Sequence, residues 1–121
     1  MSEPPSGDPP RLDRALVREL IDILSIAQMR PVLAKFIADT DRRLTAIEHA
    51  AAARRMAEIG DHLHTLKSTS ATLGFAQLSR LARELEAEAG RTIVEPARLA
   101  ELRAAFDASL TSLAAAFPEL A

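Results

Sequence analysis

The chain has 121 residues, a formal net charge of −2 and no cysteine. This length fits one domain with a substantial core, and the lack of cysteine excludes disulfides and thiolate chemistry. The near-neutral charge and the absence of Trp and Tyr give no reason to expect binding to nucleic acid or to an anionic membrane. No apolar run approaches the length of a membrane span, and the first residues lack a signal peptide's basic and apolar character. We therefore expect a soluble, cytoplasmic protein.

Good helix formers dominate the composition. Ala and Leu supply much of the 48% hydrophobic content, and β-branched residues are sparse, which predicts an all-α fold. Residues 1–10 hold four of the seven prolines together with Ser, Gly and Asp, a composition that predicts a disordered tail. Residues 11–121 are expected to form one helical domain.

Two helices are predicted in the first half of the chain. The first begins near Leu12 and has an apolar stripe made of Leu12, Ala15, Leu16, Leu20, Ile23, Leu24 and Ala27. Pro31 suits the first turn of the second helix, where its missing N–H is not needed. The inward residues of this helix are expected to be Leu33, Phe36, Ile37, Thr40, Leu44, Ile47 and Ala51. The helix must end between Ala50 and Arg55, although no Gly or Pro marks the boundary.

Three further helices are predicted in the second half. The third covers about residues 54–73, and Gly74 ends it because glycine adopts the left-handed conformation at low cost. The fourth runs from residue 75 or 76 to about residue 89, and Gly90 closes it. Pro96 lies in the first turn of the last helix, whose stripe is Leu99, Leu102, Phe106, Ser109, Leu110, Leu113 and Phe117. Such helices predict an antiparallel four-helix bundle, with the first, shorter helix capping one end.

The third helix is predicted to carry a histidine on an open face. At about 100° per residue, one side, expected to face the core, collects Met56, Ile59, Leu63, Leu66, Ser70 and Leu73. His64 points about a third of a turn away from this stripe. The residues that share its sector are Ala57, Gly60, Lys67, Ser68 and Ala71. All except the lysine are small, so another protein can approach the imidazole closely.

This arrangement suits the transfer of a phosphoryl group. An exposed imidazole can act as a neutral nucleophile near pH 7. Lys67, one turn after His64, can bring its ammonium group to the incoming phosphoryl oxygens. Phosphoryl transfer depends mainly on positioning and charge neutralisation. We therefore predict that His64 is phosphorylated and that Lys67 neutralises phosphoryl charge. The predicted partner-docking residues are Ala57, Gly60, Ser68 and Ala71.

One segment of this helix resembles the motif of the histidine-containing phosphotransfer (HPt) family. It reads His64-Thr65-Leu66-Lys67-Ser68-Thr69-Ser70 and continues as Ala71-Thr72-Leu73-Gly74. In the family the histidine is followed by x-Leu-Lys-Gly-Ser-x and, a few residues on, by Leu-Gly-Ala. The downstream spacing continues with Leu78, Leu81, Leu85 and Glu86. Two residues depart from the pattern: Ser68 replaces the usual Gly, and Phe75 replaces a small residue.

The resemblance covers about residues 12–117 and implies a phosphocarrier without kinase activity of its own. His64 would accept a phosphoryl group from a receiver-domain aspartate and pass it to another receiver-domain aspartate. The implied partners are response-regulator receiver domains and a hybrid sensor histidine kinase. Mg²⁺ is expected on the receiver, and no cofactor on this chain, which has no nucleotide-binding motif. A complete bundle needs no partner to close its core, so we expect a monomer.

Two other classes of function are left open by the sequence. A purely structural helical adaptor would account for the amphipathic helices but not for the motif. A metal site is suggested by Asp61 and His64, a carboxylate and a histidine three residues apart, but a di-iron bundle needs a second such pair and inward glutamates. His62 diverges too far from His64 to share an ion with it and is predicted to be a half-buried structural residue near Arg55. His49 is predicted to face solvent.

Overall fold

The computed structural model describes residues 10–120, and this part of the chain is helical, without strands. Its helices are α1 (Arg14–Leu24), α2 (Ile26–Ala52), α3 (Met56–Thr72), α4 (Ala76–Ala89), α5 (Pro96–Ala116) and the short 3-10 helix η1 (Pro118–Leu120). The predicted all-α class is confirmed. The tail predicted over residues 1–10 lies outside the described residues except for Pro10.

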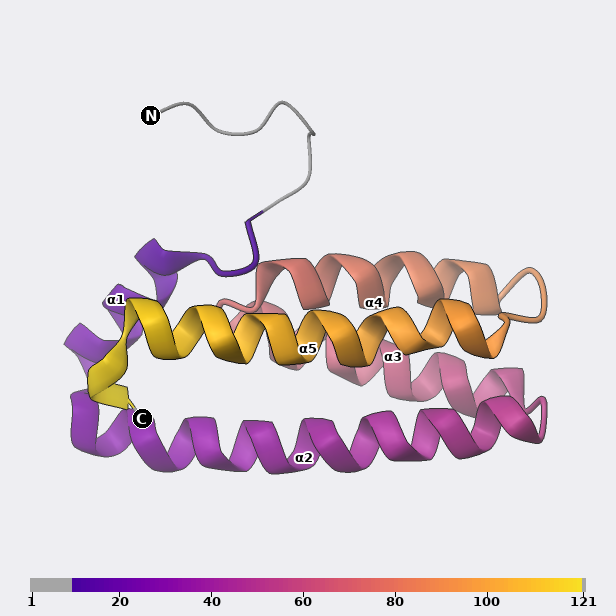
Figure 1. Ribbon diagram of the computed structural model, residues 1–121, viewed down its shortest axis with the longest axis horizontal. Coiled ribbons are helices and arrows are strands. Elements are labelled where there is room, and N and C mark those ends of the chain that lie inside the picture. Colours follow the sequence, from indigo (N-terminus) through magenta and orange to yellow (C-terminus); the bar gives the residue numbers. More distant parts are fainter. Residues whose placement is uncertain (1–9, 121) are drawn as a thin grey trace.

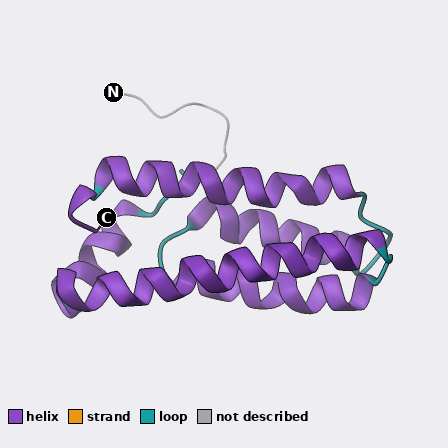
Figure 2. Cartoon of the chain, turned by 60° about the horizontal axis from the view of Figure 1, so that its bottom comes forward, coloured by secondary structure: helices purple, strands orange, loops and turns teal. Residues whose placement is uncertain are grey.

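The four longer helices lie side by side along the long axis of the molecule, and α1 lies at one end (Figure 1). α3 packs against α2 and α4, while α5 packs against α4 and α2. Short loops join the helices at the two ends (Figure 2). These four helices therefore surround one common core. Between residues 10 and 120, no helix combines the length and the apolar character that crossing a membrane requires.

The core is aliphatic with a small aromatic centre. Phe36 lies between two other rings, with centroids 4.7 Å from Phe75 and 6.4 Å from Phe106. Ring pairs at such distances add about 0.5–1.5 kcal/mol beyond the burial of their area. The largest fully buried side chains of the aliphatic part include Met29, Ile47, Ile59, Leu63, Leu66, Leu78, Leu85 and Leu102. Phe75, which departs from the family pattern, is thus a core residue at the beginning of α4.

The predicted inward face of the first helix is confirmed in part: Leu12 is buried, and Leu20 and Leu24 pack against the core. Its centre is wrong. α1 buries Val17 and Ile21, whereas Ile23 is 76% exposed. This short helix has two adjacent apolar faces, so its own periodicity cannot select between them. The choice is made by packing, because Val17 lies directly over Gly74 at the turn between α3 and α4.

The predicted position of Pro31 is also wrong, because Pro31 lies inside α2 and not in its first turn. The helix begins one turn earlier, at Ile26, since Ser25 caps it: the Ser25 Oγ accepts a hydrogen bond from the backbone N–H of Gln28 at 3.3 Å. Ala27 consequently belongs to α2 and is exposed. Serine as a cap was the stronger start signal, and proline here removes one backbone hydrogen bond within the helix.

The turn between α2 and α3 is formed without glycine. Arg54 takes the left-handed conformation there, with φ of 57°. Residues other than glycine adopt this conformation infrequently, which explains why the sequence shows no boundary. The backbone N–H of Arg55 donates to the Ala50 carbonyl at 2.9 Å and closes the turn. At the end of α3, by contrast, Gly74 has φ of +84°, as predicted.

Replacing Gly74 with alanine is expected to lower the free energy of unfolding by about 1–3 kcal/mol. A Cβ here would lie 2.9 Å from Val17 Cγ2 and 3.2 Å from the Asp13 carbonyl oxygen, on a backbone that side chains disfavour. The Asp13 N–H also donates to the Gly74 carbonyl at 2.8 Å, so the contact with the chain before α1 would be disturbed. Urea denaturation measures the change.

Gly60→Ala is the matched control for this substitution. Gly60 is inside α3, and apart from its chain neighbours and the nearby backbone of its own helix no atom of the described residues lies within 4 Å of a Cβ added there. Alanine should therefore be neutral or stabilise the domain by up to about 1 kcal/mol. Equal stabilities for Gly74→Ala and the unchanged protein would contradict the packing of Val17 over this turn.

Candidate functional site

The packing of α3 turns His64 outward. Leu63 and Leu66 are fully buried on one face of the helix and fix its rotation about its axis. The His64 side chain, between them in sequence, keeps 65% of its surface exposed. The stripe predicted for this helix therefore faces the core, and its burial places His64 at the surface.

Glu86 of α4 joins His64 to Lys67. Its Oε2 lies 2.9 Å from His64 Nδ1, and its Oε1 lies 2.9 Å from Lys67 Nζ. The Lys67 and Glu86 side chains are half-buried, each 29% exposed. The pKa of Glu86 lies below its ordinary value, chiefly because Lys67 donates a hydrogen bond to it; partial burial opposes the shift, and the hydrogen bond from His64 adds to it. Glu86 is thus an ionised carboxylate that bridges the two residues.

This contact determines which imidazole nitrogen is available. An ionised carboxylate can only accept hydrogen bonds. His64 Nδ1 therefore carries the proton and donates a hydrogen bond to Glu86. In the neutral ring, Nε2 then holds the unshared electron pair. Nε2 is separated from the Glu86 contact by one ring carbon. The site therefore presents an exposed imidazole with Nε2 as its nucleophilic atom.

A hollow of about 610 Å³ opens beside His64, between α3 and the end of α4. Of the small residues predicted around the histidine, Ala57 and Gly60 line this hollow. Ser68 lines a separate groove of about 360 Å³ between α2 and α3, and Ala71 is exposed. The four residues share the outer side of α3, but Ala57 and Gly60 border one depression, Ser68 borders another, and Ala71 lines neither.

The other two histidines lie away from this arrangement. His62 is 26% exposed, and Arg43 Nη1 donates to its Nδ1 at 3.0 Å. Its neighbours toward solvent include Glu58, whose Oε2 lies 4.0 Å from Nε2. His62 is thus half-buried, as predicted, and His49 is exposed. Asp61 borders the same hollow as His64, but within the described residues no three His, Cys, Asp or Glu side chains group in a way that could hold a metal ion.

Glu86 is the site residue to which the sequence assigned no role. It lies 22 positions after His64 on a different helix, so the periodicity of α3 cannot reveal the contact. One signal was available: Glu86 follows four residues after the buried Ala82 and directly after the buried Leu85. A charge at the margin of a buried stripe is placed to reach the neighbouring helix.

The model of the Hpt domain family matches residues 31–114, a range that includes His64, Lys67 and Glu86. No curated protein and no solved structure matches the chain significantly. The matched range spans more than half of the chain and contains all of α3 and α4. The chain therefore belongs to the Hpt domain family, whose members have a phosphotransfer role in two-component signalling.

Proposed function

We propose that this chain is a phosphorelay intermediate that accepts a phosphoryl group on His64 from one receiver-domain aspartate and passes it to another. One observation carries the proposal: Glu86 Oε2 lies 2.9 Å from Nδ1 of the exposed His64 ring. Because an ionised carboxylate only accepts hydrogen bonds, this contact favours the proton on Nδ1 and leaves Nε2 as the nucleophile. Lys67 stands one turn away with its ammonium group on the same carboxylate. Nucleophile and cation are thus held together.

The proposed transfer needs no group that this chain would have to bind. Nε2 of His64 attacks the phosphorus of the receiver's phosphoaspartate; the N–P bond forms while the P–O bond breaks, and its electron pair leaves on the aspartate carboxylate. Lys67 turns from Glu86 to the phosphoryl oxygens and neutralises part of their charge. The second transfer is the same reaction in reverse. We assign Mg²⁺ to the receiver.

The wider proposal follows from the same assignment. The chain would be a phosphocarrier without kinase activity, supplied by a hybrid sensor histidine kinase through its receiver domain. It would act in the cytoplasm. It would act as a monomer, since α2–α5 pack on one another around their own core. We also take the fold to be an antiparallel four-helix bundle that α1 caps, which the side-by-side course of α2–α5 supports (Figure 1).

The adaptor alternative predicts a different outcome in one experiment. A radiolabelled phosphorylated receiver domain is mixed with the chain, and the label on each protein is followed with time. A phosphorelay intermediate takes up label from the receiver, whereas a structural adaptor takes up none. The shared contacts of His64, Lys67 and Glu86 favour the first outcome, because an adaptor has no need of them.

Bulk on the outer side of α3 is expected to slow transfer without unfolding the domain. Ser68 and Ala71 are exposed, so Ser68→Gln and Ala71→Gln should melt like the unchanged protein. The added side chains should hold a receiver away from His64, and a displacement of about 1 Å lowers the rate of a positioned reaction by up to about 100-fold. Tm and the rate of transfer from a phosphorylated receiver are measured together.

Ala100→Gln provides the matched control for these variants, because Ala100 is exposed on α5 and the same side chain is added. It should change neither Tm nor the transfer rate. If Ser68→Gln and Ala71→Gln also transfer at the unchanged rate, receivers do not approach His64 across this face. If both variants unfold, the face contributes to the core.

A further inference from the structure

We propose that Glu86 is a positioning residue that keeps a proton on Nδ1 of phosphorylated His64 and so sets the pH range in which the phosphoryl group leaves. The inference rests on the proposed function, since it concerns the phosphorylated form of the same histidine. It begins from the contact between Glu86 Oε2 and His64 Nδ1, at 2.9 Å. Phosphorylation at Nε2 leaves Nδ1 and its proton in place.

The chemistry of the leaving group makes this proton important. When the N–P bond breaks, its electron pair returns to Nε2 and the phosphorus bonds to the acceptor oxygen. If Nδ1 is protonated, the phosphorylated ring is cationic and departs as neutral imidazole. If Nδ1 has lost its proton, the ring must depart as an imidazolate anion, which is a much poorer leaving group. A group that holds the proton on Nδ1 therefore keeps the phosphoryl group transferable.

The charges around the ring fit this role. The hollow beside His64 is lined by residues of α3, α4 and the following Gly90, and its charged members among the described residues are Asp61 and Glu86. Of these two carboxylates, Glu86 is the one that is hydrogen-bonded to the ring. In the resting protein Lys67 offsets part of the Glu86 charge. When Lys67 turns to the phosphoryl oxygens, that charge acts fully on the ring.

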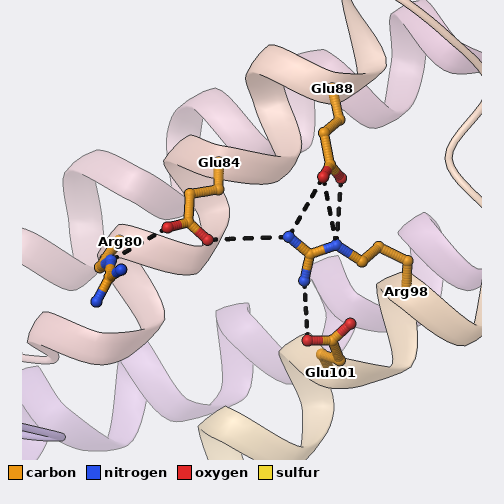
Figure 3. A network of polar contacts seen from close by, with 5 residues as sticks. All are labelled: Arg80, Glu84, Glu88, Arg98 and Glu101. Atoms are coloured by element: carbon orange, nitrogen blue, oxygen red, sulfur yellow. Dashed lines mark hydrogen bonds and ion pairs between the residues drawn. The ribbon is translucent and has the colours of Figure 1, made fainter. Parts of the chain in front are cut away.

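Two other glutamates of α4 contact α5 and not His64, and one of them supplies a control. Glu84 and Glu88 lie on the opposite side of the helix and face Arg98 of α5, at 3.8 Å and 3.3 Å (Figure 3). Arg98 also donates to Glu101 at 2.8 Å. These contacts join α4 to the beginning of α5. A change at Glu84 removes a carboxylate from the same helix without touching His64.

The test uses the whole chain, phosphorylated with phosphoramidate so that no receiver is needed. Phosphorus-31 NMR follows the phosphohistidine signal across the pH range in which imidazoles titrate. A carboxylate beside the ring favours the protonated form, so its removal should lower the titration midpoint. In Glu86→Gln we expect the midpoint to fall by about one pH unit. Above the midpoint, loss of the phosphoryl group to water should slow about tenfold, while the rate well below the midpoint should stay nearly unchanged.

Two further variants separate this role from a structural one. Glu84→Gln should have the same titration midpoint as the unchanged protein. Glu86→Asp, which keeps the charge on a shorter side chain, should have a midpoint between those of Glu86→Gln and the unchanged protein. A Glu86→Gln midpoint equal to that of the unchanged protein would overturn the inference, as would an equal loss of rate at every pH. Failure of His64 to take any phosphoryl group in the unchanged protein would contradict the proposed function itself, so the two failures are distinguishable.

Discussion

His64→Gln is expected to abolish phosphoryl acceptance, whereas His62→Gln should keep most of it. Among the histidines of the described residues, His64 is the one that combines an exposed ring with a carboxylate on Nδ1, which frees Nε2. His62 is half-buried, and its Nδ1 accepts a hydrogen bond from Arg43. Labelling from a phosphorylated receiver measures both variants. Glutamine cannot form the phosphoramidate, so the expected effect at His64 is complete loss.

The two substitutions control for each other because they make the same change two residues apart on one helix. Both variants should remain folded, since neither imidazole belongs to the apolar core. The label on the unchanged protein should be lost in acid and kept in base, as a phosphoramidate requires. Loss of label in His62→Gln with retention in His64→Gln would contradict the assignment of the site.

Lys67→Ala is expected to slow transfer by an amount equal to about 1–3 kcal/mol of transition-state stabilisation, roughly 5-fold to 150-fold. In the proposed transfer the ammonium group of Lys67 offsets charge on the phosphoryl group, which a methyl group cannot do. Stability should fall by at most about 1 kcal/mol, because the pair with Glu86 is partly exposed and such pairs contribute little. Single-turnover transfer from a phosphorylated receiver measures the rate, and urea denaturation measures the stability.

Lys67→Arg is the control that retains charge without the same geometry. It should recover part of the lost rate, since guanidinium also binds phosphoryl oxygens but is a planar, less compact group. A Lys67→Ala variant that transfers at the unchanged rate would show that the lysine is an ordinary surface residue paired with Glu86.

The sequence predicts the face of α3 well because one pattern determines it. Ile59, Leu63 and Leu66 recur at helical spacing and are all fully buried, so the outward direction of His64 follows directly. The start of α5 is also predicted correctly, because Pro96 begins that helix. The role of Glu86 was not predictable in this way, because it depends on how α4 packs against α3 and not on the period of either helix.

The errors near the beginning of the chain have a related cause. The inward face of α1 is selected by the position of Val17 over Gly74, a contact between segments more than fifty positions apart. The start of α2 is selected by a competition between Ser25 and Pro31, two signals that the sequence presents together. Local patterns decide where one helix turns its apolar side, while contacts between helices decide the rest.

We propose that Nε2 of His64 is the atom that carries the phosphoryl group. The most direct test is NMR of the chain labelled with nitrogen-15 in its histidines, after phosphorylation by a receiver domain. We expect coupling between phosphorus and Nε2 of His64 alone, with Nδ1 still protonated and bonded to Glu86. Coupling to Nδ1, coupling to His62, or no phosphohistidine at all would contradict the proposed function.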